Sequence, residues 1–209
     1  MNGKGCIFPL SIISGVEYKR PAMKSTLLRA LAGFLIVTAT LPLAQAAPIT
    51  VDDNITLAQV EAAQKAWGRA LVQISKDYEK GGRELATRTA KKVIDSAYAY
   101  QSGPVLFKPT LTVSPQTFRI TREGALAYFV GGNSDFPNDD GFALKGWRSC
   151  SIENEAVYIS GDLAITMGKV RLKDKNGKIT EVDKTWAFKK QDNDTLQIVL
   201  HHSSLPHAP

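Results

Sequence analysis

Cysteine and histidine are scarce in this sequence, which holds two cysteines and three histidines among 209 residues. Cys6 lies close to the N-terminus, and Cys150 is the only cysteine in the part of the chain with a foldable pattern. A single cysteine cannot form an intrachain disulfide, so a disulfide-stabilised domain is excluded. Cys150 has no neighbouring histidine or aspartate and is expected to be a small buried apolar residue rather than a nucleophile.

Long apolar runs are almost absent as well. The one that exists, Ala30–Leu43, follows Lys24 and Arg29 and precedes Ala44-Gln45-Ala46. This order of charges, apolar run and small-x-small motif is typical of a secretory signal peptide. The run is too short for a membrane span, and a retained amphipathic anchor is the alternative.

Three segments follow from this pattern. Residues 1–22 are expected to be a spurious extension, residues 23–46 the signal peptide, and residues 47–209 a single domain. The expected location is therefore the periplasm or the cell exterior, with no membrane association after cleavage.

The predicted domain also has no large excess of positive or negative charge. The whole chain carries a formal charge of +6, with 26 Lys and Arg against 20 Asp and Glu. Five of those bases and one acid precede residue 47, so the domain itself carries only about +2. Such a balance gives no basic field for nucleic acid, and no nucleic-acid partner is expected.

Two amphipathic helices are predicted at the start of the domain. Apolar residues recur every three or four positions from Leu57 to Tyr78, and Thr56 with Gln59 forms a capping-box pattern. Gly81-Gly82 is expected to end this helix, and a second helix is predicted over residues 84–98.

Short elements follow the helices. Val105–Phe107 and Thr117–Ile120 are β-type runs, and the prolines between them indicate edge strands or irregular loops. Thr121 can cap a short helix that ends at Gly131-Gly132.

From Gly146 onward the sequence predicts four strands joined by tight turns. Asn176-Gly177 between two β-type runs is a strong hairpin signal, and the other turns are similarly short. Helices followed by an antiparallel meander predict an α+β domain.

Two stretches resemble a known superfamily. The closing "LHHSSLP" resembles the end of the calcium/calmodulin-dependent kinase II association domains, a branch of the nuclear transport factor 2-like (SnoaL-like) superfamily. "VLFKPT" together with "FRITREGALAYFVGGN" and "DDGFALKGW" resembles a secreted bacterial subgroup. The resemblance implies helices packed on a curved antiparallel sheet that forms a cone with a central pocket. It also implies a homodimer through the outer sheet face, and either ligand binding or isomerase or dehydratase activity.

The last predicted strand divides the two adjacent histidines between opposite faces. Leu196, Ile198, Leu200 and His202 share one face, and the apolar members predict that this face is interior. If no bulge intervenes, His202 lies at the pocket mouth, while His201 and Ser203 lie on the outer face or at an interface.

Lys184 interrupts an otherwise apolar strand face. It shares that face with Val182, Trp186 and Phe188, so it either snorkels toward solvent or is a partly buried cation for an anionic ligand. A basic residue near this position lines the pocket in the association domains that this chain resembles. The remaining pocket candidates are aromatic residues that could equally be plain core: Trp186, Trp147, Tyr128 and Tyr98.

The sequence gives little support for a metal site or for a catalytic serine. Adjacent histidines on a strand diverge, His207 follows Pro206 in a tail, and no cysteine pair exists, so no metal, no cofactor and no zinc cyclohydrolase are expected. Ser203 lacks a Gly-x-Ser-x-Gly context, which argues against a serine hydrolase.

Two functions remain in competition. The favoured hypothesis is a domain that binds a small organic ligand, anionic if Lys184 faces it, or a protein partner, without chemistry of its own. The alternative is an acid–base enzyme of isomerase or dehydratase type with His202 as base. Its partners would come from Tyr98, Tyr128, Asp135, Asp139 or Asp140, although the last two are expected to belong to a solvated turn.

Overall fold

The computed structural model describes residues 54–207, which all belong to one compact unit. The predicted extension and signal peptide lie outside the described residues and stay predictions. In the described part of the chain, no helix combines the length and hydrophobicity of a membrane span.

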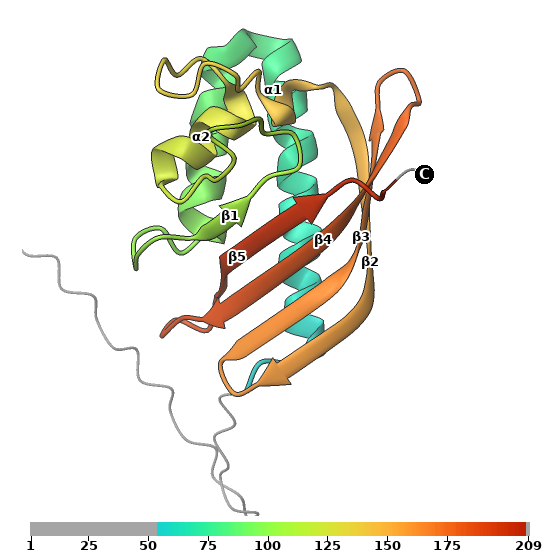
Figure 1. Cartoon of the computed structure of the whole chain (residues 1–209). Helices are drawn as coiled ribbons and strands as arrows, with labels where there is room; N and C mark the ends of the chain where they lie inside the picture. The colour runs from blue at the N-terminus through green and yellow to red at the C-terminus, as the bar shows by residue number, and fades with distance from the viewer. Residues whose placement is uncertain (1–53, 208–209) are drawn as a thin grey trace, which may run out of the picture. The chain divides into compact units, whose positions relative to one another are not determined.

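Helix α1, Leu57–Ala97, contains both helices predicted from the sequence. The amide of Gln59 donates to Thr56 Oγ1 at 3.2 Å and the amide of Thr56 donates to Gln59 Oε1 at 2.8 Å, so the expected capping box is present. The helical conformation breaks at Gly81-Gly82, where Gly82 has a φ of 66° that suits glycine. Figure 1 shows the chain changing direction at this break.

The four predicted strands form the expected antiparallel meander: β2 Trp147–Ser160, β3 Leu163–Asp174, β4 Ile179–Lys190 and β5 Leu196–Ser204. A short strand, β1 Leu106–Lys108, pairs with β5 in parallel, so the strand order is β1-β5-β4-β3-β2. Thr117–Ile120, predicted as a β-type run, forms no strand. Its main link to β1 is the Arg119 amide, which donates to the Phe107 carbonyl at 2.8 Å.

Two short helices connect β1 to β2. Helix α2, Arg122–Val130, begins at the predicted cap Thr121, whose Oγ1 accepts the amide of Gly124 at 3.1 Å. The helix ends at Gly131, which has a φ of 62°. A single 3-10 turn, η1 Phe142–Leu144, then leads into β2.

The core lies between the helices and one face of the sheet (Figure 1). Trp67, Leu71 and Ile74 of α1 are buried in the same cluster as Trp186 and Phe188 of β4. A Cβ at Gly68 would lie 2.9 Å from Cys150 Sγ, so glycine permits the close approach of α1 to β2. Helices packed on one face of a sheet that is antiparallel except for β1 confirm the α+β prediction.

Candidate functional site

A bulge in β5 decides which histidine faces the core. Ala187 pairs with Leu200 and Phe188 pairs with Ile198, which leaves Val199 as the extra residue. A bulge of this kind shifts the alternation of side chains by one residue. Ile198 and His201 are consequently both 2% exposed, whereas His202 is exposed to solvent.

The orientations predicted for this strand are therefore wrong beyond the bulge. His201, expected on the outer face, is buried, and Ser203 is buried with it. His202, expected at the pocket mouth, points outward instead. His207 is exposed and lies apart from both, as expected for the tail.

His201 is hydrogen-bonded through both ring nitrogens. Its Nδ1 lies 2.9 Å from Tyr98 Oη, and its Nε2 lies 2.8 Å from Lys184 Nζ. Trp67 Nε1 donates to Tyr98 Oη at 2.9 Å. These four side chains, Trp67, Tyr98, His201 and Lys184, form a continuous buried chain of hydrogen bonds that we call the relay.

Chemistry fixes one direction in the relay. An indole N–H can only donate, so Tyr98 Oη accepts from Trp67. A phenol oxygen can accept a second hydrogen bond, so the directions of the other two contacts depend on the tautomer of His201. With the ring hydrogen on Nε2, Tyr98 Oη donates to Nδ1 and Nε2 donates to a neutral Lys184. With the ring hydrogen on Nδ1, Nδ1 donates to Tyr98 Oη and Lys184 donates to Nε2.

Burial favours the neutral forms of Lys184 and His201. It lowers the pKa of Lys184 from 10.5 to about 7, with a small opposing effect of Cys150. The pKa of His201 is held well below its ordinary value by burial first, and then by the nearby Lys184 and His202. Snorkelling of Lys184 is thus excluded, because the residue is 6% exposed and Nζ lies 2.8 Å from a buried imidazole.

Aromatic rings pack around the relay. Phe107 stacks on the His201 ring at a centroid distance of 4.4 Å, and Trp186 lies 5.6 Å away. Lys184 Nζ lies 5.1 Å from the Trp67 ring and 5.4 Å from the Trp186 ring. Such ring faces attract an ammonium and partly offset its burial when Lys184 is protonated.

A second polar group lies beside the relay. Ser203 follows His201 by two residues on the same face of β5, and its Oγ lies 2.5 Å from Thr110 Oγ1. Burial raises the pKa of Tyr128, while backbone hydrogen bonds from Leu111 and Thr110 act in the opposite direction. Tyr128 therefore keeps its hydroxyl proton at neutral pH. We call Thr110, Tyr128 and Ser203 the hydroxyl cluster.

A cavity of about 50 Å³ borders the hydroxyl cluster at Tyr128. Leu111 contributes one wall, and residues 138–142 contribute another, with Lys145 also in the lining. A space of this size can hold a small molecule.

The aromatic pocket candidates take different positions. Tyr98 belongs to the relay, and Tyr128 borders the cavity. Trp186 packs against His201, and its Nε1 is buried without a hydrogen-bond partner among residues 54–207. Trp147 instead packs on Phe142 and donates its indole N–H to the Phe142 carbonyl at 2.8 Å.

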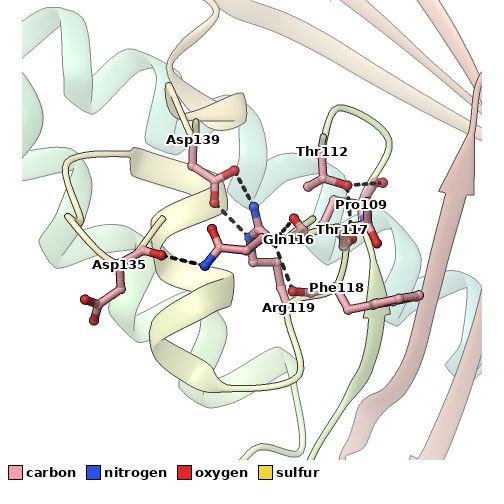
Figure 2. Close-up of polar contacts among 8 residues, drawn as sticks. All are labelled: Pro109, Thr112, Gln116, Thr117, Phe118, Arg119, Asp135 and Asp139. Carbon is pink, nitrogen blue, oxygen red and sulfur yellow. Dashed lines mark hydrogen bonds and ion pairs between the residues drawn. The ribbon is translucent and has the colours of Figure 1, made fainter. Parts of the chain in front are cut away.

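Asp139 corrects a further expectation. It is not part of a solvated turn but forms a buried ion pair with Arg119, in which both side chains are at most 2% exposed (Figure 2). Asp140, its neighbour, is exposed as predicted.

Several residues around the site were not predicted as site residues from the sequence: Trp67, Phe107, Thr110 and Arg119. Trp67 was identified only as a core residue of the helix. Thr110 and Arg119 lie in the irregular segment between β1 and α2, where no periodicity tells which side chains point inward. Residues 54–207 hold no group of three or more His, Cys, Asp or Glu that could bind a metal ion.

Comparison with known proteins adds to this geometry. Residues 58–205 match the model of the family described as metal-independent carbonic anhydrase. A metal-independent carbonic anhydrase from Nostoc sp. (strain PCC 7120 / SAG 25.82 / UTEX 2576) is 59% identical over 157 residues. That alignment covers 75% of this chain and 77% of the relative.

Solved structures agree with the sequence matches. The iota-carbonic anhydrase from a cyanobacterium, complexed with bicarbonate, is 57% identical, with a TM-score of 0.76 over 79% of this chain and 100% of that chain. A Xanthomonas campestris chain, assigned to the calcium/calmodulin dependent protein kinase II association domains, is 25% identical. It covers 78% of this chain and 100% of that one with a TM-score of 0.48. The family that matches is more specific than the superfamily expected from the sequence.

These matches overturn the favoured hypothesis on function. The sequence favoured a binding domain without chemistry, whereas the similar proteins are enzymes. With a family model that spans residues 58–205 and a relative at 59% identity, this chain belongs to the metal-independent carbonic anhydrase family.

Proposed function

We propose that this chain catalyses the reversible hydration of CO2 to bicarbonate without a metal ion. The observation that carries the proposal is the family match over residues 58–205. The relative complexed with bicarbonate supports the same substrate class, a small anion, for this chain. The relay and the hydroxyl cluster supply the groups that such a reaction requires.

The hydroxyl cluster is suited to hold the oxygen atoms of CO2 and bicarbonate. Thr110, Tyr128 and Ser203 each carry an O–H group, and Tyr128 remains a neutral donor because burial raises the pKa of its phenol. Donors fixed in a water-poor site stabilise charge that develops on a substrate oxygen. The adjoining cavity of about 50 Å³ at Tyr128 has room for a small molecule such as CO2 or bicarbonate.

The relay is suited to take up the proton that hydration releases. When the water oxygen bonds to the CO2 carbon, one proton must leave the water. In the tautomer with the ring hydrogen on Nε2, Tyr98 Oη can pass its hydrogen to His201 Nδ1 while Nε2 passes its own to Lys184. Tyr98 Oη then takes up the proton that leaves the water. The charge ends on Lys184, whose pKa of about 7 allows the proton to be released again near neutral pH.

The two histidines give a matched test of this proposal. We expect His201→Gln to lower the rate of CO2 hydration by about 100-fold or more, because it removes the ring that links Tyr98 to Lys184. His202→Gln, an exposed neighbour, should leave the rate within about twofold. Stopped-flow hydration assays with a pH indicator measure both variants. Equal effects of the two substitutions would reject His201 as the functional histidine.

We also propose that the chain forms a homodimer through the sheet face that none of the described helices covers. Tyr158 and Ile165 pair across β2 and β3, and both are exposed together with Met167, at 64%, 38% and 61%. An exposed apolar patch of this kind is typical of a protein–protein interface, and a second copy offers a matching patch. Light scattering should give a dimer mass for the protein and a monomer mass for Ile165→Asp. A monomer at micromolar concentration without the substitution would contradict the proposal.

Export from the cytoplasm remains a proposal that rests on residues 23–46. Their order of charged residues, apolar run and small-x-small motif supports a cleaved signal peptide. Mass spectrometry of the protein from the culture's periplasmic fraction should find Ala47 at the N-terminus. Recovery of uncleaved protein in the cytoplasm would argue against it.

A further inference from the structure

Arg119 and Asp139 form a buried ion pair outside the relay and the hydroxyl cluster. Arg119 Nε donates to Asp139 Oδ2 at 2.8 Å, and Nη2 donates to Oδ1 at 2.7 Å. The Arg119 and Asp139 side chains are 2% and 1% exposed. The guanidinium also lies 4.7 Å from the centroid of the Phe136 ring.

The same guanidinium holds the loop that precedes it. Nη1 donates to the carbonyls of Gln116 at 2.7 Å and Phe118 at 3.0 Å, so both the carboxylate and the loop are bound by one side chain. Figure 2 shows two further ties within this region. Thr112 Oγ1 donates to the Thr117 carbonyl at 3.0 Å, and Gln116 Nε2 donates to the Asp135 carbonyl at 2.9 Å.

The ion pair thereby joins the two walls of the cavity at Tyr128. Leu111 belongs to the loop that Arg119 holds, and Asp139 belongs to the segment 138–142, which also lines the cavity. The loop also carries Thr110, whose hydroxyl lies against Ser203. A shift of either wall would change the spacing of the hydroxyl cluster around the cavity.

Stability alone gives a weak reason for such a pair. A buried ion pair costs several kcal/mol of desolvation per ion, and apolar residues of similar volume often replace one without loss of stability. Bidentate geometry, in contrast, fixes distance and angle between two segments, which apolar contacts do not.

We propose that Arg119 and Asp139 are positioning residues for CO2 and bicarbonate, which set the distance between the Thr110–Leu111 wall and the wall that carries Asp139. This proposal rests on the function proposed above. Neither residue touches the substrate in this account; both act through the loop that carries Thr110. A misplacement of about 1 Å in such a site can cost about 100-fold in rate.

The test replaces the whole pair and compares it with an exposed pair of the same geometry. Arg119→Met with Asp139→Leu removes both charges together, so no unpaired ion is left buried. Arg122→Met with Asp95→Leu is the control, because Arg122 binds Asp95 through Nε and Nη2 at 2.6 and 2.8 Å on the surface. Arg119→Lys keeps the charge but loses the bidentate contact with Asp139. If the double variant does not fold, this single variant tests the positioning role in its place.

Three measurements are made on each folded variant: kcat/KM for CO2, hydrogen exchange at the amides of Thr110 and Leu111, and the unfolding temperature. We expect kcat/KM to fall about 10- to 100-fold and exchange at these amides to accelerate at least tenfold. The unfolding temperature should stay within a few degrees of that of the unmodified protein, and the control pair should change none of the three. A stable variant with unchanged kcat/KM and exchange would overturn the positioning role.

The first two readouts separate this proposal from the one on which it rests. If the unmodified protein hydrates no CO2 but the variant still exchanges faster at Thr110 and Leu111, the proposed function fails, while the Arg119–Asp139 pair is still shown to position the loop. If the unmodified protein and the variant are equally active, the Arg119–Asp139 pair has no positioning role in catalysis, and the proposed function is retained.

Discussion

Replacing Lys184 by Met tests the most unusual feature of the site, a buried amine. Methionine keeps the length of the side chain but carries no charge and cannot form the hydrogen bond that links Lys184 Nζ to His201 Nε2. In the folded protein the pKa of Lys184 is about 7 rather than 10.5, so between these values the unfolded chain binds a proton that the folded chain does not. The free energy of unfolding must therefore rise with pH across this window, and the cost of burying the amine is largest below pH 7.

The size of the effect follows from the depressed pKa. Each unit by which the pKa is lowered corresponds to about 1.36 kcal/mol. Burial of the amine therefore lowers the free energy of unfolding at pH 7 by on the order of 4 kcal/mol. The lost hydrogen bond to His201 offsets about 1 kcal/mol of the gain on substitution. We therefore expect Lys184→Met to be more stable than the unmodified protein at pH 7 by a few kcal/mol.

Urea unfolding at pH 7 and pH 8.5 measures this directly. Between pH 7 and pH 8.5 the free energy of unfolding of the unmodified protein should rise by on the order of 2 kcal/mol relative to that of Lys184→Met, because other titrating groups contribute equally to both. Lys173→Met is the control, since Lys173 is exposed on β3. The same variants should differ in stopped-flow assays: Lys184→Met loses about 100-fold in kcat, and Lys173→Met does not. Identical pH slopes for Lys184→Met and the unmodified protein would refute the claim that the amine is neutral in the fold.

Other substitutions test the surroundings of the site. Trp67→Phe keeps an aromatic ring but removes the N–H that donates to Tyr98. It should lower the free energy of unfolding by about 1 kcal/mol in urea and the hydration rate several-fold. An unchanged rate would show that Trp67 has no part in the relay. Ser203→Ala should lower kcat/KM about tenfold in the stopped-flow assay, with Ser204→Ala, its partly buried neighbour, near the unmodified value. Gly68→Ala should destabilise the fold by about 1–3 kcal/mol in thermal unfolding, because the new Cβ would lie 2.9 Å from Cys150 Sγ. Cys150→Ala should relieve part of that loss, and strict additivity of the two substitutions would contradict the proposed contact.

Much of the fold could be predicted because its signals are local. The Thr56–Gln59 capping box, the glycine break in α1 and the Asn176-Gly177 turn each depend on residues within a few positions of one another. The interior face of β4 also followed from strict alternation, since no bulge lies between Val182 and Trp186.

The site was harder to predict because it depends on relations between distant residues. The bulge at Val199 leaves no mark in the sequence, yet it exchanges the positions of His201 and His202. The partner of Asp139 is 20 residues away, in a loop without periodicity, so its carboxylate looked like part of an ordinary polar turn. The resemblance to association domains pointed to the superfamily, but CO2 chemistry came only from relatives of much higher identity.

The central claim is that this chain hydrates CO2 with its own side chains. The most direct test is the stopped-flow rate of CO2 hydration by protein that has been stripped of metal with a chelator and checked by elemental analysis. The account predicts a rate well above that of buffer alone, unchanged by the chelator and by added Zn²⁺, and rising with pH through about 7 as Lys184 becomes neutral. A rate that vanishes with the chelator and returns with Zn²⁺ would contradict it.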